Sequence, residues 1–335
     1  MTIEIIGITV LWVFLYGYLI VASIDFGAGF YSYYAKMTRK KHSIRTVIDR
    51  YLSPVWEVTN VFLVFFFIGI IGFFPDSAFY FGTALLVPGS IALILLAIRG
   101  SFYAFANYGA RESNIYVFLY GMSGLFIPAA LSIVLIISEG GFIFYDGETV
   151  TLLNDKLLSS PFAWSGVLLA IVSVLFISAS FLTYYAFQME DKDAFRLLRR
   201  FALIWSGPTI LASILFFFML STHNPEHFQA MIDMYWMFGA SLICFVFAVW
   251  LIYKGINLGI AFSLVALQYG LAFFGYGATH LPYILYPYIT IYESITGPEM
   301  GVALIIAFLL GLSLLIPSLY LLLRLFIFNT KYIKG

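Results

Sequence analysis

The chain has 335 residues, of which 62% are hydrophobic and only 10% are charged, and its formal net charge is zero. An ordinary soluble domain has about 25% charged residues. This composition therefore excludes a soluble globular fold and predicts an all-α integral membrane protein. A neutral chain has no electrostatic reason to bind nucleic acid. Its single cysteine, Cys244, excludes a disulfide framework and an iron–sulfur centre within the chain.

Nine apolar runs are long enough to span a membrane as helices of about 20 residues. In chain order these runs are 5–31, 53–73, 79–98, 115–138, 162–187, 203–220, 234–253, 257–276 and 300–328. The first run is too long for a signal peptide, so we expect it to be retained as the first transmembrane helix. Three prolines between 278 and 299 predict an irregular cap there rather than a helix.

The nine runs suggest a division into two units and a last helix. We expect a first four-helix unit over 1–138, a second four-helix unit with outer loops over 139–299, and a ninth transmembrane helix with a cytoplasmic tail over 300–335. Tyr33-Tyr34-Ala35 and Tyr184-Tyr185-Ala186 end the first and fifth runs alike. This similarity is typical of an internal repeat, but chance resemblance between apolar sequences explains it equally well.

The basic residues lie almost entirely on one side of the predicted spans. Sixteen of the 17 fall in the odd-numbered connections or at the C-terminal end, and only Lys156 falls on the other side. The positive-inside rule then predicts that the N-terminus is outside and the C-terminus cytoplasmic. The connections on the outer side are acidic and include Glu139, Asp146, Glu148, Asp155, Glu226, Asp233, Glu293 and Glu299.

Asp25 is a carboxylate near the end of the first apolar run. It lies about six residues before the cytoplasmic end of that run, or about 9 Å along a helix. Ionisable groups at membrane depth often mark a proton or ion path, which favours a proton-linked or cofactor-linked role. The alternative is a hydrogen bond between helices. Gly27 and Gly29 follow on the chain, and small residues allow another helix to approach closely.

A second carboxylate, Glu57, lies just after the first basic connection. Ser53-Pro54 is a good helix start, so Glu57 falls in the first turn, where the helix dipole favours an anion. The alternative is a proton acceptor near the cytoplasmic surface, with Trp56 as its lid. Arg99 ends the third run and has two interpretations as well. It is either an anchor at the membrane surface or the neutralising partner of a buried carboxylate or a haem propionate.

The four histidines, His42, His223, His227 and His280, all lie outside the predicted spans. Histidine is a common axial ligand of haem, so we expect no haem bound by this chain alone. His223 and His227 have the spacing of one helical turn, but Pro225 between them opposes a helical metal site. The sequence therefore predicts no metal ligands.

Four motifs lie in order along nearly the whole chain. They are Asp25-Phe26-Gly27-Ala28-Gly29, Pro54-Val55-Trp56-Glu57, Arg99-Gly100 and Tyr286-Pro287-Tyr288. On these motifs the chain resembles subunit II of the cytochrome bd family of quinol oxidases. In the second motif the family usually has Asp followed by Gly-Asn, whereas this chain has Glu57-Val58-Thr59-Asn60. The carboxylate is retained in a different local sequence.

The resemblance implies an enzyme complex in the prokaryotic plasma membrane that oxidises quinol, reduces dioxygen to water and generates proton motive force in aerobic respiration. Haems b and d would lie in subunit I, the partner of this chain. Subunit II is expected to have two four-helix bundles and one additional helix, to stabilise subunit I, and to help conduct protons or dioxygen to it. Membrane lipid would surround the complex. Whether a small single-helix subunit also belongs to it is left open. The proton-path candidates are Asp25, Glu57 and Trp56, with structural or electrostatic support from Gly27, Gly29 and Arg99.

A secondary transporter with Asp25 as its coupling site is the competing hypothesis. Transporters of that kind have broken helices with polar residues near the middle of the membrane. The middles of the runs here are almost wholly apolar, which favours the oxidase subunit. We also expect the chain to be unstable without its partner and to contact that partner beside Gly27 and Gly29.

Overall fold

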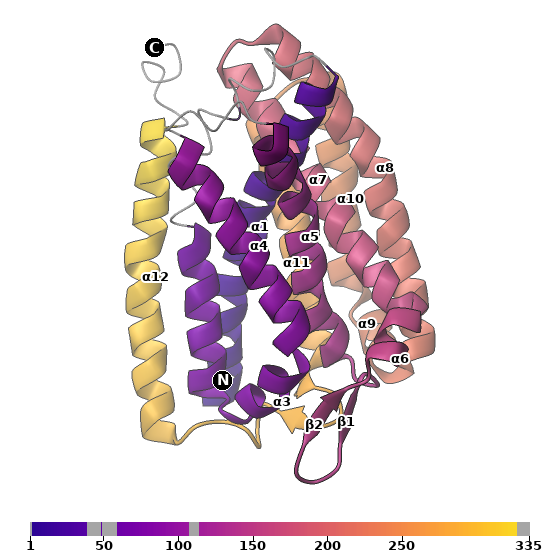
Figure 1. The fold of residues 1–335 in the computed structure, drawn as a ribbon, viewed down its shortest axis with the longest axis vertical. Helices are drawn as coiled ribbons and strands as arrows, with labels where there is room; N and C mark the ends of the chain where they lie inside the picture. Colours follow the sequence, from indigo (N-terminus) through magenta and orange to yellow (C-terminus); the bar gives the residue numbers. More distant parts are fainter. Residues whose placement is uncertain (1, 39–47, 49–58, 107–113, 327–335) are drawn as a thin grey trace.

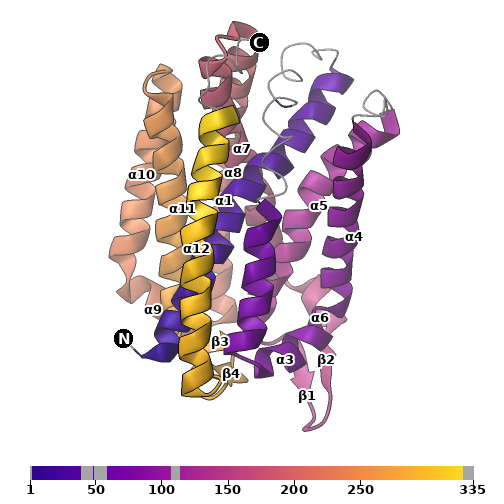
Figure 2. The ribbon, with the colours of Figure 1, turned by 90° about the vertical axis from the view of Figure 1, so that its left-hand side faces the viewer.

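The computed structural model of the chain describes residues 2–38, 48, 59–106 and 114–326. These residues form an elongated bundle of helices with two small β-hairpins at one end (Figures 1 and 2). The helices are α1 (Ile3–Met37), the helix Thr59–Phe73, α3 (Asp76–Ala84), α4 (Leu86–Ala106), α5 (Asn114–Ser138), α6 (Asn154–Ser159), α7 (Pro161–Gln188), α8 (Lys192–His223), α9 (Pro225–Asp233), α10 (Tyr235–Lys254), α11 (Leu258–His280) and α12 (Pro298–Phe326). The strands are β1 (Ile143–Tyr145), β2 (Val150–Leu152), β3 (Tyr283–Leu285) and β4 (Ile289–Thr290).

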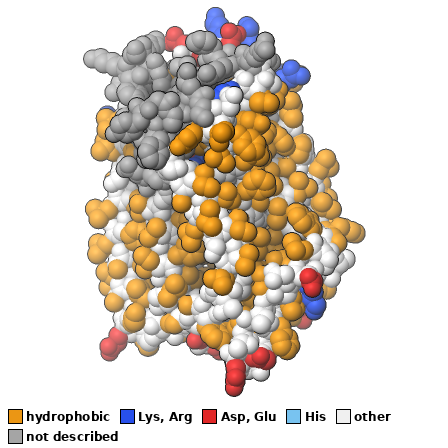
Figure 3. Space-filling view, viewed as in Figure 1, with side chains coloured by type: hydrophobic (Ala, Val, Ile, Leu, Met, Phe, Trp, Pro, Cys, Tyr) orange, Lys and Arg blue, Asp and Glu red, His pale blue; other side chains and the backbone are white. Residues whose placement is uncertain are grey.

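The prediction of an all-helical membrane protein is confirmed. Seven helices of the described chain are long and apolar enough to cross a membrane, namely α1, α5, α7, α8, α10, α11 and α12. An eighth span is counted if α3 and α4 together form one crossing. The helix Thr59–Phe73 is shorter, and the predicted start of its span at residue 53 lies outside the described residues. Hydrophobic side chains cover much of the face shown in Figure 3, between the two ends of the bundle.

The third predicted run, 79–98, is not one straight helix. It is divided between α3 and α4, which meet at an angle of 77°. The reason is Pro88, which has no N–H to donate to the carbonyl oxygen of Ala84 and whose ring would clash with that group. Because Pro is tolerated in the first turn of a helix, α3 ends at Ala84 and a new helix begins at Leu86.

The two ends of the bundle differ in charge. The end that carries β1–β4, α6 and α9 is called the strand end here, and Lys156 in α6 is the one Lys or Arg among the described residues there. The opposite end, called the basic end, carries Lys36, Lys192, Arg196, Arg199, Arg200, Lys254 and Arg324. Helix α1 begins at the strand end and α12 ends at the basic end (Figure 1).

Backbone hydrogen bonds close the strand end. Strands β1 and β2 pair antiparallel, as do β3 and β4. The amide of Tyr286 donates to the carbonyl oxygen of Ser138 at 2.9 Å, and the amide of Thr296 donates to that of Phe73 at 2.8 Å. The segment between α11 and α12 therefore binds the ends of two earlier helices. It forms strands and turns rather than a helix, as its three prolines predicted.

Helices α1, α5 and α7 pack closely because glycines lie at their contacts. A Cβ atom on Gly27 would lie 2.3 Å from Cβ of Ser178 in α7. A Cβ atom on Gly124 would lie 2.2 Å from the carbonyl oxygen of Phe26. The prediction that Gly27 and Gly29 face a partner subunit is therefore wrong. Gly27 faces α7, and Gly29 faces Tyr120 of α5 and the side chain of Arg99.

We expect Gly124→Ala to destabilise the protein, because its methyl group meets a backbone carbonyl that can move only if α1 and α5 separate. Overpacking of this kind costs about 1–3 kcal/mol. The measurement is the thermal unfolding midpoint of the purified assembly in detergent.

Gly82→Ala is the matched control, since Gly82 is exposed in α3 and no atom lies within 4 Å of the added methyl group. Its midpoint should equal or slightly exceed that of the wild type. Equal midpoints for the two variants would contradict the close approach of α1 and α5.

Candidate functional site

A buried ion pair joins α1 to α4. Nε of Arg99 donates to Oδ2 of Asp25 at 2.7 Å, and Nη2 of Arg99 donates to the carbonyl oxygen of the same residue. The arginine side chain is 0% exposed and the aspartate side chain 4%. Two charges at this depth are tolerated only when they neutralise each other and their hydrogen-bonding groups are satisfied.

Helix α5 completes this cluster. Nη1 of Arg99 donates to the carbonyl oxygen of Tyr120 at 3.0 Å and to Oγ of Ser123 at 3.4 Å. The hydroxyl group of Tyr120 donates to Oδ1 of Asp25 at 3.3 Å. The guanidinium group also lies over the Tyr120 ring, with its central carbon 4.1 Å from the ring centroid. One arginine thus holds three helices together through charge, hydrogen bonds and a cation–π contact.

The structure changes the predicted position of Asp25. Helix α1 continues to Met37, so Asp25 lies twelve residues before the helix end rather than six, about 18 Å along the axis at 1.5 Å per residue. Arg99 likewise lies inside α4 and not in a surface connection. Of its two interpretations, the geometry shows the neutralising partner of a buried carboxylate.

The other predicted site residues divide into two groups. Gly29 lies beside the guanidinium group, and a Cβ atom there would lie 3.0 Å from Nη1 of Arg99 and 2.7 Å from the carbonyl oxygen of Tyr120. Its missing side chain therefore leaves the space that the arginine fills. Glu57 and Trp56 lie outside the described residues.

A cavity of about 220 Å³ lies between α4 and α5. It is lined by Ile98, Ser101, Tyr116, Leu119 and Tyr120. Tyr120 therefore borders this cavity and also hydrogen-bonds to Asp25.

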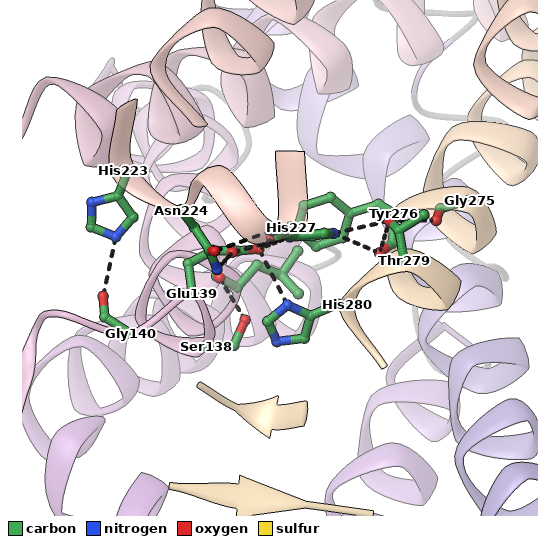
Figure 4. Close-up of polar contacts among 11 residues, drawn as sticks. Ser138, Glu139, Gly140, His223, Asn224, His227, Gly275, Tyr276, Thr279 and His280 are labelled. Carbon is green, nitrogen blue, oxygen red and sulfur yellow. Dashed lines mark hydrogen bonds and ion pairs between the residues drawn. The ribbon is translucent and has the colours of Figure 1, made fainter. Parts of the chain in front are cut away.

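A second polar cluster lies at the strand end and was not predicted (Figure 4). Its centre is Glu139, the residue after α5, whose side chain is 0% exposed. Nδ1 of His227 lies 2.8 Å from Oε1 of this carboxylate and 3.1 Å from Oε2. The Asn224 side chain donates to Oε2 at 2.9 Å, and the hydroxyl group of Tyr276 donates to Oε1. His280 Nδ1 lies 3.5 Å from Oε1.

The groups beside the Glu139 carboxylate are imidazole rings rather than Lys or Arg side chains among the described residues. Burial raises the pKa of Glu139, but the hydrogen bond with His227, the nearby charge of the two histidines and the Tyr276 hydroxyl together lower it below its ordinary value.

The histidines are arranged differently from the predicted pairing. Helices α8 and α11 extend to His223 and His280, so these two residues end helices instead of lying in loops. His223 stacks on Phe162, with the ring centroids 4.4 Å apart, and its Nε2 lies 3.1 Å from the carbonyl oxygen of Gly140 rather than against the Glu139 carboxylate. Pro225 begins α9 and turns the chain, so His227 meets Glu139 and His280. His42 lies outside the described residues.

The family of the chain follows from its likeness to known proteins. A family model described as cytochrome bd terminal oxidase subunit II matches residues 3–326. The chain belongs to this family. It is 37% identical to a putative cytochrome bd menaquinol oxidase subunit II of Bacillus subtilis (strain 168), over 98% of this chain and 97% of that protein.

A solved structure agrees with this assignment. The chain matches a chain in the structure of bd oxidase from Geobacillus thermodenitrificans with a TM-score of 0.87 and 58% identity, covering 98% of this chain and 100% of that one. The chain is therefore a multi-pass membrane subunit of a bacterial cytochrome bd quinol oxidase, a terminal oxidoreductase of the respiratory chain. Family membership decides against the secondary transporter.

We expect Asp25→Leu and Arg99→Met each to lower the stability of the oxidase by about 3–5 kcal/mol, because each leaves one buried charge without its partner. The double variant should recover most of this loss, because it leaves neither charge. The measurement is the thermal unfolding midpoint of the assembly for all four members of the cycle.

Asp193→Leu is the control, since Asp193 forms an exposed pair with Arg196 at 3.8 Å and its side chain is 79% exposed. Exposed pairs contribute little, so its midpoint should stay close to that of the wild type. A double variant no more stable than either single variant would rule out direct charge compensation.

Proposed function

We propose that this chain is the subunit of the bd oxidase that binds no haem itself, that it stabilises the haem-bearing subunit I, and that it conducts protons from the cytoplasm towards that partner. Its two four-helix units, 1–138 and 139–299, and the last helix over 300–335 would form the body of the subunit. The basic end would face the cytoplasm, in keeping with the positive-inside rule. The N-terminus would then lie outside and the C-terminus inside.

The observation that carries the proton role is the polar cluster around Asp25. Charged side chains inside a membrane are costly and usually mark a functional path. The carboxylate, the Tyr120 hydroxyl and the Ser123 hydroxyl supply polar groups within otherwise apolar helices. The cavity that Tyr120 borders gives space for water. Glu57 and Trp56 would form the entrance from the cytoplasm.

The chemistry of the complex explains why such a path is needed. Reduction of dioxygen to water consumes protons, and quinol oxidation releases them. If the consumed protons come from the cytoplasm and the released ones leave on the other side, the reaction generates a membrane potential. Quinol and dioxygen would then be substrates of the assembled complex, with the haems in subunit I.

We expect Glu57→Gln and Asp25→Asn to slow quinol oxidase turnover per haem, because each amide keeps the shape of the side chain but removes its charge. Asp25→Asn should also lower the amount of assembled oxidase, since Arg99 loses its charged partner. A tenfold loss corresponds to about 1.4 kcal/mol of activation barrier. Turnover and voltage generation are measured in proteoliposomes and normalised to haem content. Asp193→Asn, at an exposed position of the basic end, should keep wild-type turnover.

Tyr120→Phe separates transport from assembly. It keeps the ring over Arg99 but removes the hydroxyl group that donates to Asp25, so turnover should fall while the thermal midpoint changes little. Wild-type turnover and voltage in this variant and in both amide variants would leave Asp25 and Glu57 with structural roles alone.

We also expect subunit II to depend on its partner. The chain expressed without subunit I should give little protease-resistant monomer in detergent, and chain separated from the complex should retain no haem absorbance. A monodisperse, protease-resistant monomer would refute the dependence. Stoichiometric haem on the isolated chain would refute the assignment of all haems to the partner.

A further inference from the structure

We propose that Glu139, His227 and His280 form a binding site for a divalent transition-metal ion of the zinc class at the strand end. This site is distinct from the Asp25 cluster and from the proposed proton path. The potential ligand atoms of the three side chains all lie within 4.8 Å of one another. Figure 4 shows the carboxylate and both imidazole rings gathered at one point.

The donor types and spacings fit such an ion. Two imidazole nitrogens and one carboxylate oxygen are the three-ligand set of many zinc sites that keep an open fourth position. Ligand atoms about 2.0–2.1 Å from a tetrahedral zinc ion lie about 3.3 Å from one another. Oε1 of Glu139 is 2.8 Å from Nδ1 of His227 and 3.5 Å from Nδ1 of His280. Small side-chain movements would therefore bring all three atoms to ligand distance.

The surroundings of His227 direct one ring nitrogen towards the site. Its Nε2 lies 2.9 Å from Oγ1 of Thr279 and 3.3 Å from the carbonyl oxygen of Tyr276. A carbonyl oxygen can only accept a hydrogen bond, so the side of the ring that faces Tyr276 and Thr279 suits an N–H donor and leaves Nδ1 to face Glu139 at 2.8 Å. A metal ion bound by Nδ1 would keep both contacts of Nε2.

The other features of the cluster favour a metal ion over a simple hydrogen bond between His227 and Glu139. That hydrogen bond alone would leave His280 without a role. The third donor converges on the same carboxylate oxygen, and Nε2 of His280 has no hydrogen-bond partner among the described residues. Asn224 hydrogen-bonds to the Glu139 carboxylate and Thr279 to the His227 ring, and such contacts orient the ligands in metal sites.

The site lies where α9 meets the ends of α5 and α11. Glu139 follows α5, His227 lies in α9, and His280 is the last residue of α11. A bound ion would join three elements that are far apart in sequence. His280 has the most exposed side chain of the three, at 10%, so an ion would enter past it. An ion that binds only the folded state stabilises that state.

The test uses the intact oxidase, treated with EDTA, exchanged into buffer and titrated with Zn²⁺ alone. Zinc bound after gel filtration is measured by mass spectrometry, and the thermal midpoint is recorded with and without Zn²⁺. We expect one zinc ion per complex and a higher midpoint in its presence. His280→Gln and Glu139→Gln should weaken zinc binding at least tenfold and abolish the midpoint shift.

Two further variants distinguish loss of zinc binding from loss of folding, because neither changes a proposed ligand. Thr279→Val keeps the side-chain shape but removes the hydroxyl beside Nε2, and loss of such a partner of a ligating histidine weakens metal binding about 10–100-fold. His223→Gln is the matched control, because this histidine is at the same end but outside the cluster. It should bind zinc like the wild type. Haem absorbance and gel filtration establish that each variant has assembled.

Three outcomes would overturn the proposal. The first is a wild-type complex that binds no zinc at micromolar concentration. The second is undiminished binding in assembled His280→Gln and Thr279→Val complexes. The third is equal weakening in His223→Gln, which would place the ion elsewhere. If Glu139→Gln fails to assemble, the other two cluster variants decide.

Discussion

The pairing of Arg99 with Asp25 is the interaction on which the packing of the first helices depends. Neither charge is stable alone in an apolar interior, so α1 and α4 must lie within hydrogen-bond distance of each other. Arg99 is the largest fully buried side chain among the described residues, and its guanidinium group needs space as well as acceptors. Gly29 provides the space, and the backbone of Tyr120 provides one of the acceptors. The position of α5 therefore follows from the same arginine.

Close packing of α1 on α7 extends this arrangement. The Ser178 hydroxyl donates to the carbonyl oxygen of Ile24 at 2.8 Å, and the Tyr31 hydroxyl donates to that of Leu175 at 2.8 Å. Such bonds between membrane helices contribute only about 0.6 kcal/mol on average, so shape accounts for most of the stability. Gly27 lets the two backbones come close enough for these bonds to form. Polar contacts then fix the register of helices that dispersion forces hold together.

The spans could be predicted from the sequence because their length and composition follow from the hydrocarbon layer. Helix ends could not, because outside that layer caps decide them. Helix α8, for example, begins at Lys192, well before its apolar run, since Asp191 accepts hydrogen bonds from the amides of Asp193 and Ala194. Pro88 indicates a break between α3 and α4, but the continuous hydropathy of the run 79–98 predicted a single helix there.

The sites were harder to predict than the spans, because their members are distant in sequence. Asp25 and Arg99 were both recognised as candidates, but nothing in the sequence showed that they meet across 74 positions. For His227, local spacing pointed to His223, whereas its partners are Glu139 and His280. Glu139 looked like one more acidic residue of an outer connection. Only the packing of three helix ends distinguishes it from its neighbours.

The hydrogen bonds that close the strand end can form only late in the synthesis of the chain. The carbonyl groups of Phe73 and Ser138 receive their hydrogen bonds from Thr296 and Tyr286, which the ribosome adds long after both helices have been made. Until then these carbonyl groups must accept hydrogen bonds from water or lipid headgroups, because their final donors have not yet been synthesised. A nascent chain that stops before residue 283 would therefore hold all but the last of its long apolar helices and still lack this closure. Completion of the fold at this end belongs to the final stage of translation.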